Sequence, residues 1–355
     1  MGQYGTLSVL DDLANVNETV AGFGEEAVAA RFAEALNVHN QMFTEMASEF
    51  ATVTDAYLVP YGGTDTAKIV ELDEWGAADA SKVTAAGNLG LPLRIYGGTL
   101  QWTRTWMNTN SVAKAAKQLD GFALADIQAF MRSVKRALFT PTNNLTYIDR
   151  LQTGLTLPLR ALLNADGQAI PSGPSGATFD GSTHTHYTGV STLTGASITA
   201  LINNVVEHGV DGTIRVYIAR ADETTVRGFS GFAEYIDARI TVGSASTIGN
   251  ASLDVNNPDN RAIGVYQGAE VWVKPWIPAN YQVAIDVGAA ERPLGVRTRT
   301  GALTGTGAFQ LQAENELYPL RAQHLGREYG VSVLGRHKAA VQMVGSTTYA
   351  APTFS

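Results

Sequence analysis

Apolar and polar residues alternate near the C-terminus, between Glu314 and Gly345. Successive side chains of a β-strand point to opposite faces, so this pattern predicts two strands joined by a tight turn, with one buried and one wet face. The buried face would carry Tyr329, Val331, Val333, Val341 and Met343. The wet face would carry Glu328, Ser332, Arg336, Lys338 and Gln342. The helices able to cover such a sheet lie far upstream, so we expect the chain's own C-terminus to close the fold.

Three other segments have apolar residues at the spacing of amphipathic helices. The first covers residues 25–53, and the second, which is the longest, covers about residues 112–138. The third covers residues 195–206, with Thr194 as a plausible N-cap and Gly209 as a stop. We expect the apolar stripe of each helix to pack in the core.

Two strand-like segments, residues 66–75 and 91–107, flank a stretch rich in glycine and alanine, which predicts a long hairpin. Ten extended residues reach about 33 Å, whereas a compact chain of this length has a radius of gyration of about 20 Å. The hairpin would therefore project beyond its own globule. Trp75 near its tip, and Trp102 and Trp106 at its base, then become candidate contact residues. The alternative is an ordinary hairpin folded onto its own domain.

Residues 151–300 indicate a mixed region of helices and strands. A strand at residues 213–219 follows the third helix, and three short strands follow between residues 261 and 286. Gln267-Gly268 separates the first two of these strands, and the sequence PWIPAN makes a rigid turn before the third.

Composition supports a mixed, strand-rich globular fold. The 355 residues are 45% hydrophobic and 16% charged, with 36 glycines, and such a length suggests about two domains. The absence of cysteine excludes disulfides, thiolate nucleophiles and cysteine-bound metals. No segment resembles a signal peptide or a transmembrane helix, so we expect a soluble protein.

Charge is distributed unevenly along the chain, whose net charge is −8. Residues 1–93 carry 14 acidic residues against three basic ones, whereas residues 94–160 carry nine basic residues against three acidic ones. The acidic segment could dock on the basic one, within a subunit or between subunits, or both could simply be solvated faces. No basic arm suited to gripping nucleic acid is present. The candidate contacts between subunits are Glu71, Asp73, Glu74, Trp75, Arg94, Arg104, Arg132, Lys135, Arg136, Arg336 and Lys338.

Candidate chemistry is sparse. His184 and His186 would share one face of a strand and could bind a metal together with Asp180, but they lie in a loop rich in glycine, serine and threonine without an obvious fourth ligand. The simpler interpretation is that both histidines are ordinary polar residues of this loop. No nucleophile elbow, phosphate-binding loop, zinc-protease motif or calcium loop is present. We therefore predict no catalytic site, no metal and no cofactor.

The order of these segments resembles that of the major capsid proteins of tailed double-stranded DNA bacteriophages, of the Hong Kong phage type. The sequences GVYQGAEVWVKPWIPANYQVAID, PLGVRT and ENELYPLRAQHLGREYGVSVLGRHKAAVQMV are similar to the closing strands and tail of that family. The resemblance covers most of the chain and is weakest before Asp55. It implies an α+β fold with an N-terminal arm, an extended loop, a peripheral domain built on a long spine helix, and an axial domain.

The resemblance also implies domain boundaries. They are 1–55 for the arm and first helix, 56–108 for the extended loop, 109–150 for the spine helix, 151–304 for the axial domain and 305–355 for the closing strands and tail. Some family members form a lysine–asparagine cross-link, for which Lys68 and Lys82 are placed in the loop without an identifiable partner. The short arm suggests a separate scaffold protein or none.

The function implied is that of a shell subunit, not an enzyme. Copies of the chain would form pentamers and hexamers in an icosahedral virion capsid, assembled in the host cytoplasm, around DNA contacted without sequence specificity. Scaffold, portal and decoration proteins would be further partners, and no membrane is involved. Two alternatives remain: an encapsulin-type compartment around protein cargo, and, from another class, a metal-dependent enzyme that uses His184 and His186.

Overall fold

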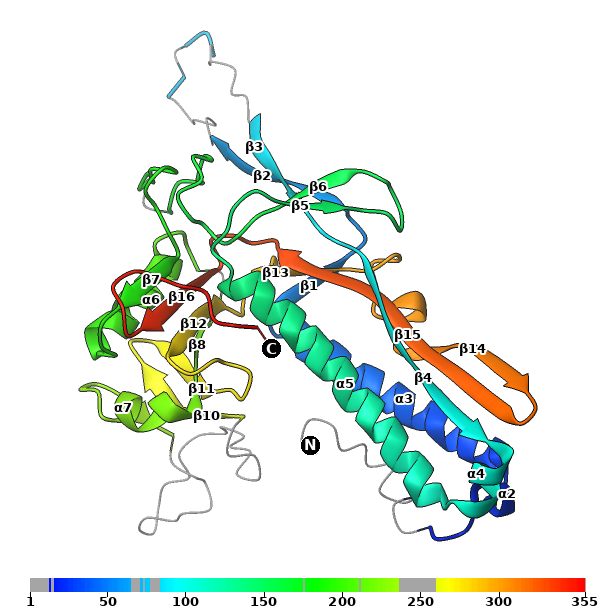
Figure 1. Ribbon diagram of the computed structural model, residues 1–355. Helices are drawn as coiled ribbons and strands as arrows, with labels where there is room; N and C mark the ends of the chain where they lie inside the picture. Colours follow the sequence, from blue (N-terminus) through cyan, green and yellow to red (C-terminus); the bar gives the residue numbers. More distant parts are fainter. Residues whose placement is uncertain are drawn as a thin grey trace.

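The computed structural model describes residue 13 and residues 16–64, 71–72, 74–76, 84–174, 176–210, 212–235 and 260–354. Two of its helices are long, and they lie side by side (Figure 1). The helices are α2 (Val20–Phe23), α3 (Glu25–Ser48), α4 (Arg104–Thr109), α5 (Val112–Phe139), α6 (Gly195–Val206) and α7 (Glu223–Arg227). None of the described helices is long and apolar enough to cross a membrane.

A five-stranded sheet packs against α5 and α3. Its strands are β1 (Ala51–Thr54), β13 (Leu294–Arg297), β15 (Leu320–Val333), β14 (Gln310–Leu317) and β4 (Arg94–Thr103). The rings of Phe43, Phe130 and Tyr329 meet between them, with centroids 4.4 to 6.1 Å apart. Helix and sheet therefore share one core, because each buries its apolar side against the other.

The second sheet has seven strands. Its order is β7 (Tyr187–Val190), β16 (Ala339–Val344), β12 (Tyr281–Asp286), β8 (Ile214–Ile218), β11 (Ala269–Val273), β10 (Arg261–Tyr266) and β9 (Ala233–Glu234). Helix α6 packs on β16 and β12, and Thr194 and Ser197 cap its first turn reciprocally. Gln267 and Gly268 both have positive φ between β10 and β11, as expected of a two-residue hairpin turn. These predicted elements are confirmed.

Two hairpins complete the chain, β2 (Leu58–Thr64) with β3 (Thr84–Gly90), and β5 (Leu145–Ile148) with β6 (Thr156–Leu159). Figure 1 shows the β2–β3 hairpin projecting away from both sheets, but neither of its strands coincides with an arm of the predicted hairpin. Most of the predicted first arm, residues 66–75, lies outside the described residues. The predicted second arm is wrong, because residues 94–103 form β4 and pair with β15 along its length. Trp102 is accordingly buried, and its indole N–H donates to Gln118. Lys68 and Lys82 lie outside the described residues.

The C-terminal strands do not form the predicted hairpin. β15 pairs with β4, β13 and β14, whereas β16 pairs with β12 and β7 in the other sheet. Alternation along a strand specifies which side chains share a face, but it does not specify the neighbouring strand. β16 lies inside its sheet, so the expectation that the chain's end closes the fold holds with a different partner.

The predicted wet face of these strands is also wrong. Ser332, Arg336, Lys338 and Gln342 are all buried. Both faces of β16 are covered, and the amide of Gln342 donates to Gln282 and Ser197 inside the core. A polar residue in a strand buried on two sides must find such partners, because an unpaired buried polar group is costly.

Candidate assembly surfaces

A basic groove, with a volume of about 510 Å³, runs beside α5. Its wall includes Arg94 and Ile95 from β4, Arg132 and Arg136 from α5, and Arg160 after β6. Ile95 is 63% exposed, although it lies among these charges. The groove therefore offers both cationic and apolar contacts to an approaching surface.

The helical period places these arginines in the groove. Arg132 and Arg136 are one turn apart and exposed, while Phe130 and Val134 of the same helix are buried. Arg136 also lies in the last turn of α5, where a cation stabilises the helix end. Lys135 is half-buried and does not line the groove.

The acidic candidates lie on the segment between β2 and β3. Glu71, Glu74 and Trp75 are exposed, and Trp75 is 83% exposed. Asp73 lies outside the described residues. Acids from elsewhere in the first 93 residues pair with bases of their own chain, since Glu25 pairs with Arg321 and Glu49 with Lys274.

The tip of the β14–β15 hairpin is an apolar surface that sequence reasoning missed. Leu317 and Tyr318 are 79% and 81% exposed, and Leu320 is exposed beside them. Arg104 lies nearby and forms an exposed ion pair with Glu316, at 2.8 Å. The signal was present in the sequence ELYPL, where three large apolar residues surround a proline. Large apolar residues usually pack inside a monomer, so their exposure makes this tip a candidate contact surface.

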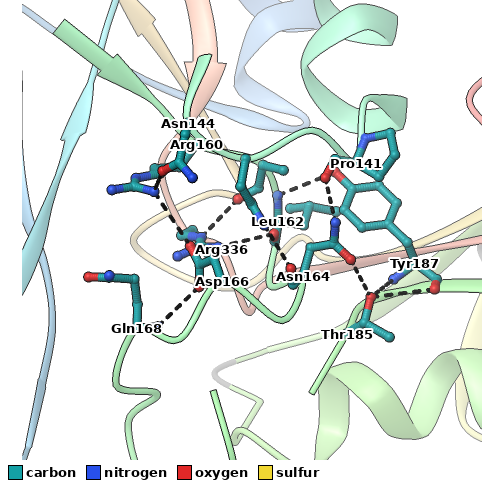
Figure 2. A network of polar contacts seen from close by, with 12 residues as sticks. Pro141, Asn144, Arg160, Leu162, Asn164, Asp166, Gln168, Thr185, Tyr187 and Arg336 are labelled. Carbon is teal, nitrogen blue, oxygen red and sulfur yellow. Dashed lines mark hydrogen bonds and ion pairs between the residues drawn. The ribbon is translucent and has the colours of Figure 1, made fainter. Parts of the chain in front are cut away.

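Arg336 is not a surface contact but the centre of a buried polar network (Figure 2). Its guanidinium pairs with Asp166 at 2.8 Å and donates to the carbonyl oxygens of Ala161 and Leu162. It also lies 4.5 Å from the ring centre of Tyr61 in β2. Burial raises the pKa of the Tyr61 hydroxyl. Arg336 thus joins the base of the projecting hairpin to the β15–β16 connection.

Lys338 is likewise buried, so its prediction as a surface contact is wrong. Its ammonium lies 3.7 Å from Asp286 and donates to the carbonyl of Gly209. Two further buried ion pairs escaped sequence reasoning: Arg297 with Asp149 at 2.8 Å, and Arg327 with Asp126 at 3.1 Å. No local pattern reveals these pairs, because their partners are more than one hundred residues apart in the chain.

The histidines lie closer together than the sequence suggests. The rings of His184 and His186 meet His208, which follows α6, and Glu207 lies beside them. Asp180 is absent from this group, since its carboxylate accepts from Ser182 and Thr183. Burial lowers the pKa of His208 to about 3 and lowers that of His186 well below its usual value, so both rings are neutral at pH 7.

Comparison with known proteins identifies the fold. No protein-family model and no curated protein sequence matches the chain. A chain in the structure of Mycobacterium phage Patience aligns over 96% of this chain and 94% of its own, with a TM-score of 0.64 and 19% identity. The chain has the tailed-phage major capsid fold.

Other solved structures resemble this capsid fold less closely. The capsid of an empty GTA particle aligns over 84% of this chain and 88% of its own, with a TM-score of 0.44 and 11% identity. The holo-SrpI encapsulin from Synechococcus elongatus PCC 7942 aligns over 87% and 90%, with a TM-score of 0.41 and 11% identity.

Proposed function

We propose that this chain is a major capsid protein, which self-assembles into the icosahedral shell around the double-stranded DNA of a tailed phage. The likeness in fold over 96% of the chain carries this proposal. The projecting hairpin and the exposed Trp75 between its two strands support it, because exposed tryptophan residues are enriched where proteins contact one another.

The domains follow from this proposal. Residues 1–55 form the arm and first helix, residues 56–108 the extended loop, and residues 109–150 the peripheral part with α5 as its spine. Residues 151–304 form the axial domain, and residues 305–355 add the closing strands and tail. The seven-stranded sheet fits the axial domain, although β16 enters it from the C-terminal segment.

The charge pattern suggests how neighbouring subunits fit together. The loop of one subunit, with Glu71, Glu74 and Trp75, lies against the basic groove of the next, where Arg132 and Arg136 are exposed. One surface ion pair contributes only about 0.2 to 1 kcal/mol. Repetition at every neighbour of a closed lattice makes the sum large, so weak contacts suffice to hold the shell.

The remaining partners follow from the capsid role. The shell would be a virion component assembled in the host cytoplasm, with packaged DNA bound through its phosphates without sequence specificity. Scaffold, portal and decoration proteins would join it, and its function would be structural rather than enzymatic. An encapsulin-type shell is the weaker alternative.

Electron microscopy of the expressed chain tests this function. We expect closed particles of uniform diameter, and monodisperse monomers at all concentrations and salt conditions would overturn the proposal. The contents of the particles distinguish a capsid from an encapsulin-type shell. The chain is coexpressed with an enzyme encoded by a neighbouring gene, and particles filled with that enzyme would indicate an encapsulin.

A further inference from the structure

Four side chains converge at the C-terminal end of α6. Nε2 of His208 lies 2.9 Å from Nε2 of His184 and 3.1 Å from Nε2 of His186. Oε1 of Glu207 lies 3.5 Å from the same atom of His184 and 3.8 Å from that of His208. All four ligand atoms lie within 4.8 Å of one another. They come from two segments, the loop before β7 and the end of α6.

The separations match those expected around a tetrahedral metal ion. Zinc binds imidazole nitrogen at about 2.0 to 2.1 Å, and tetrahedral angles then place neighbouring ligand atoms about 3.3 Å apart. The four printed separations fall on both sides of this value. Three imidazoles and one carboxylate form a ligand set that suits zinc, because zinc binds histidine nitrogen and carboxylate oxygen as well as sulfur.

The orientation of His186 is fixed from behind. This ring is fully buried, and its Nδ1 lies 2.7 Å from the carbonyl oxygen of Ala339 in β16, so Nδ1 carries the proton. Its Nε2 therefore presents a lone pair to the cluster. A backbone acceptor behind a ligand histidine is the usual support of a metal site.

Hydrogen bonds among the rings do not account for this geometry. Because Nε2 of His186 carries a lone pair, a hydrogen bond between the two rings requires Nε2 of His208 to donate its proton to His186. The same proton cannot also make a full hydrogen bond to Nε2 of His184, which lies 2.9 Å away. Within the described residues, Oε1 of Glu207 has no hydrogen-bond donor although it is buried. A cation at the centre satisfies the three lone pairs and the carboxylate together.

We propose that His184, His186, His208 and Glu207 bind one Zn²⁺ ion in a structural site. Four protein ligands leave no open position for a substrate, which distinguishes the site from a catalytic one. The ion would tie the loop before β7 to the end of α6, and through Ala339 to β16. This inference does not depend on the proposed capsid function.

The test measures zinc in the full-length chain, produced without a polyhistidine tag. Protein stripped with EDTA and dialysed against ZnCl₂ should retain about one zinc per chain, and its melting temperature should rise on zinc addition. His184→Ala and Glu207→Gln should reduce both effects, and they are chosen because these side chains are partly exposed, which favours folding of the variants.

His324→Ala is the matched control, because His324 lies in β15 and bonds to Thr99 away from the cluster. This variant should bind zinc as the unmodified chain does. Failure of the folded unmodified chain to retain zinc overturns the proposal. Equal retention by a folded His184→Ala, Glu207→Gln double variant also overturns it, since zinc would then be bound elsewhere.

Discussion

Arg336 and Arg132 both lie on polar positions of regular sequence patterns, yet the fold places them in opposite environments. Arg132 is exposed beside the groove, whereas Arg336 is fully buried and pairs with Asp166. The buried guanidinium has fixed partners from two other segments of the chain, residues 161–166 and β2. The exposed one lies at a surface where another subunit can approach. Charge alone therefore does not distinguish a residue that holds the subunit together from one that joins subunits.

The difference follows from what each arginine would lose if it were replaced. Removing one member of a buried ion pair leaves the other charge without compensation in a medium of low polarity. Removing an exposed charge leaves a hydrated surface that can reorganise. The two regions should thus respond to mutation in different measurements, one in the stability of the chain and the other in its assembly.

The largest effect is expected for Arg336→Ala. The free energy of unfolding of the unassembled chain should fall by about 3 to 5 kcal/mol, because Asp166 remains buried without its partner. Urea unfolding measured by circular dichroism checks this. Arg132→Ala is the matched control and should change the same quantity by less than about 0.5 kcal/mol. Equal losses of unfolding free energy in the two variants would contradict the distinction between a stabilising buried arginine and an exposed one.

The next effect concerns assembly. Arg132→Glu with Arg136→Glu should leave the fold intact and weaken each contact between subunits by about 1 to 2 kcal/mol, roughly tenfold in association constant. Light scattering and electron microscopy at low salt measure this, and higher salt should reduce the difference. Shells that form unchanged at low salt would contradict the groove contact.

Two companion variants sharpen this test. Lys135→Glu changes a charge on the same helix outside the groove, so assembly should be nearly unaffected. The double variant Glu71→Arg with Glu74→Arg should by itself weaken assembly. Combined with Arg132→Glu and Arg136→Glu, it should restore part of the lost assembly, because opposite charges would again face each other. Absence of any restoration would indicate that the acidic loop and the groove do not meet.

The smallest effect is expected for the exposed ion pair of Glu314 with Arg321. Hydrogen bonding from Arg321 lowers the pKa of the Glu314 carboxyl, so the pair stabilises the fold above the ordinary glutamate pKa of about 4.3. This contribution is lost as the pH falls through the lowered value. Glu314→Gln should cost about 0.2 to 1 kcal/mol at pH 7 and nothing near pH 2. An unchanged difference at both pH values would contradict this origin.

Much of the secondary structure was predictable from local pattern. The helices α5 and α6 and the turn at Gln267-Gly268 lie where the spacing placed them, because these elements depend on residues close in sequence. Helix α3 begins where predicted but ends at Ser48 rather than at residue 53, because residues 51–54 form β1 and pair with β13. The exposure of Arg132 and Arg136 on α5 follows from helical period, which puts them opposite the buried stripe, and their role as contacts between subunits stays a prediction. The tip around Tyr318 was missed because exposure of apolar residues depends on what else packs nearby.

The amino-acid sequence by itself determined the three longest helices, the strands around Gln267-Gly268 and the opposite charges of residues 1–93 and 94–160. Only the tertiary structure decided that β15 and β16 belong to different sheets, that Arg336 and Lys338 are buried, and that His208 and Glu207 join His184 and His186. The reason is physical. Local patterns report the period of one segment, whereas strand partners, burial and ligand sets arise where segments far apart in sequence pack together.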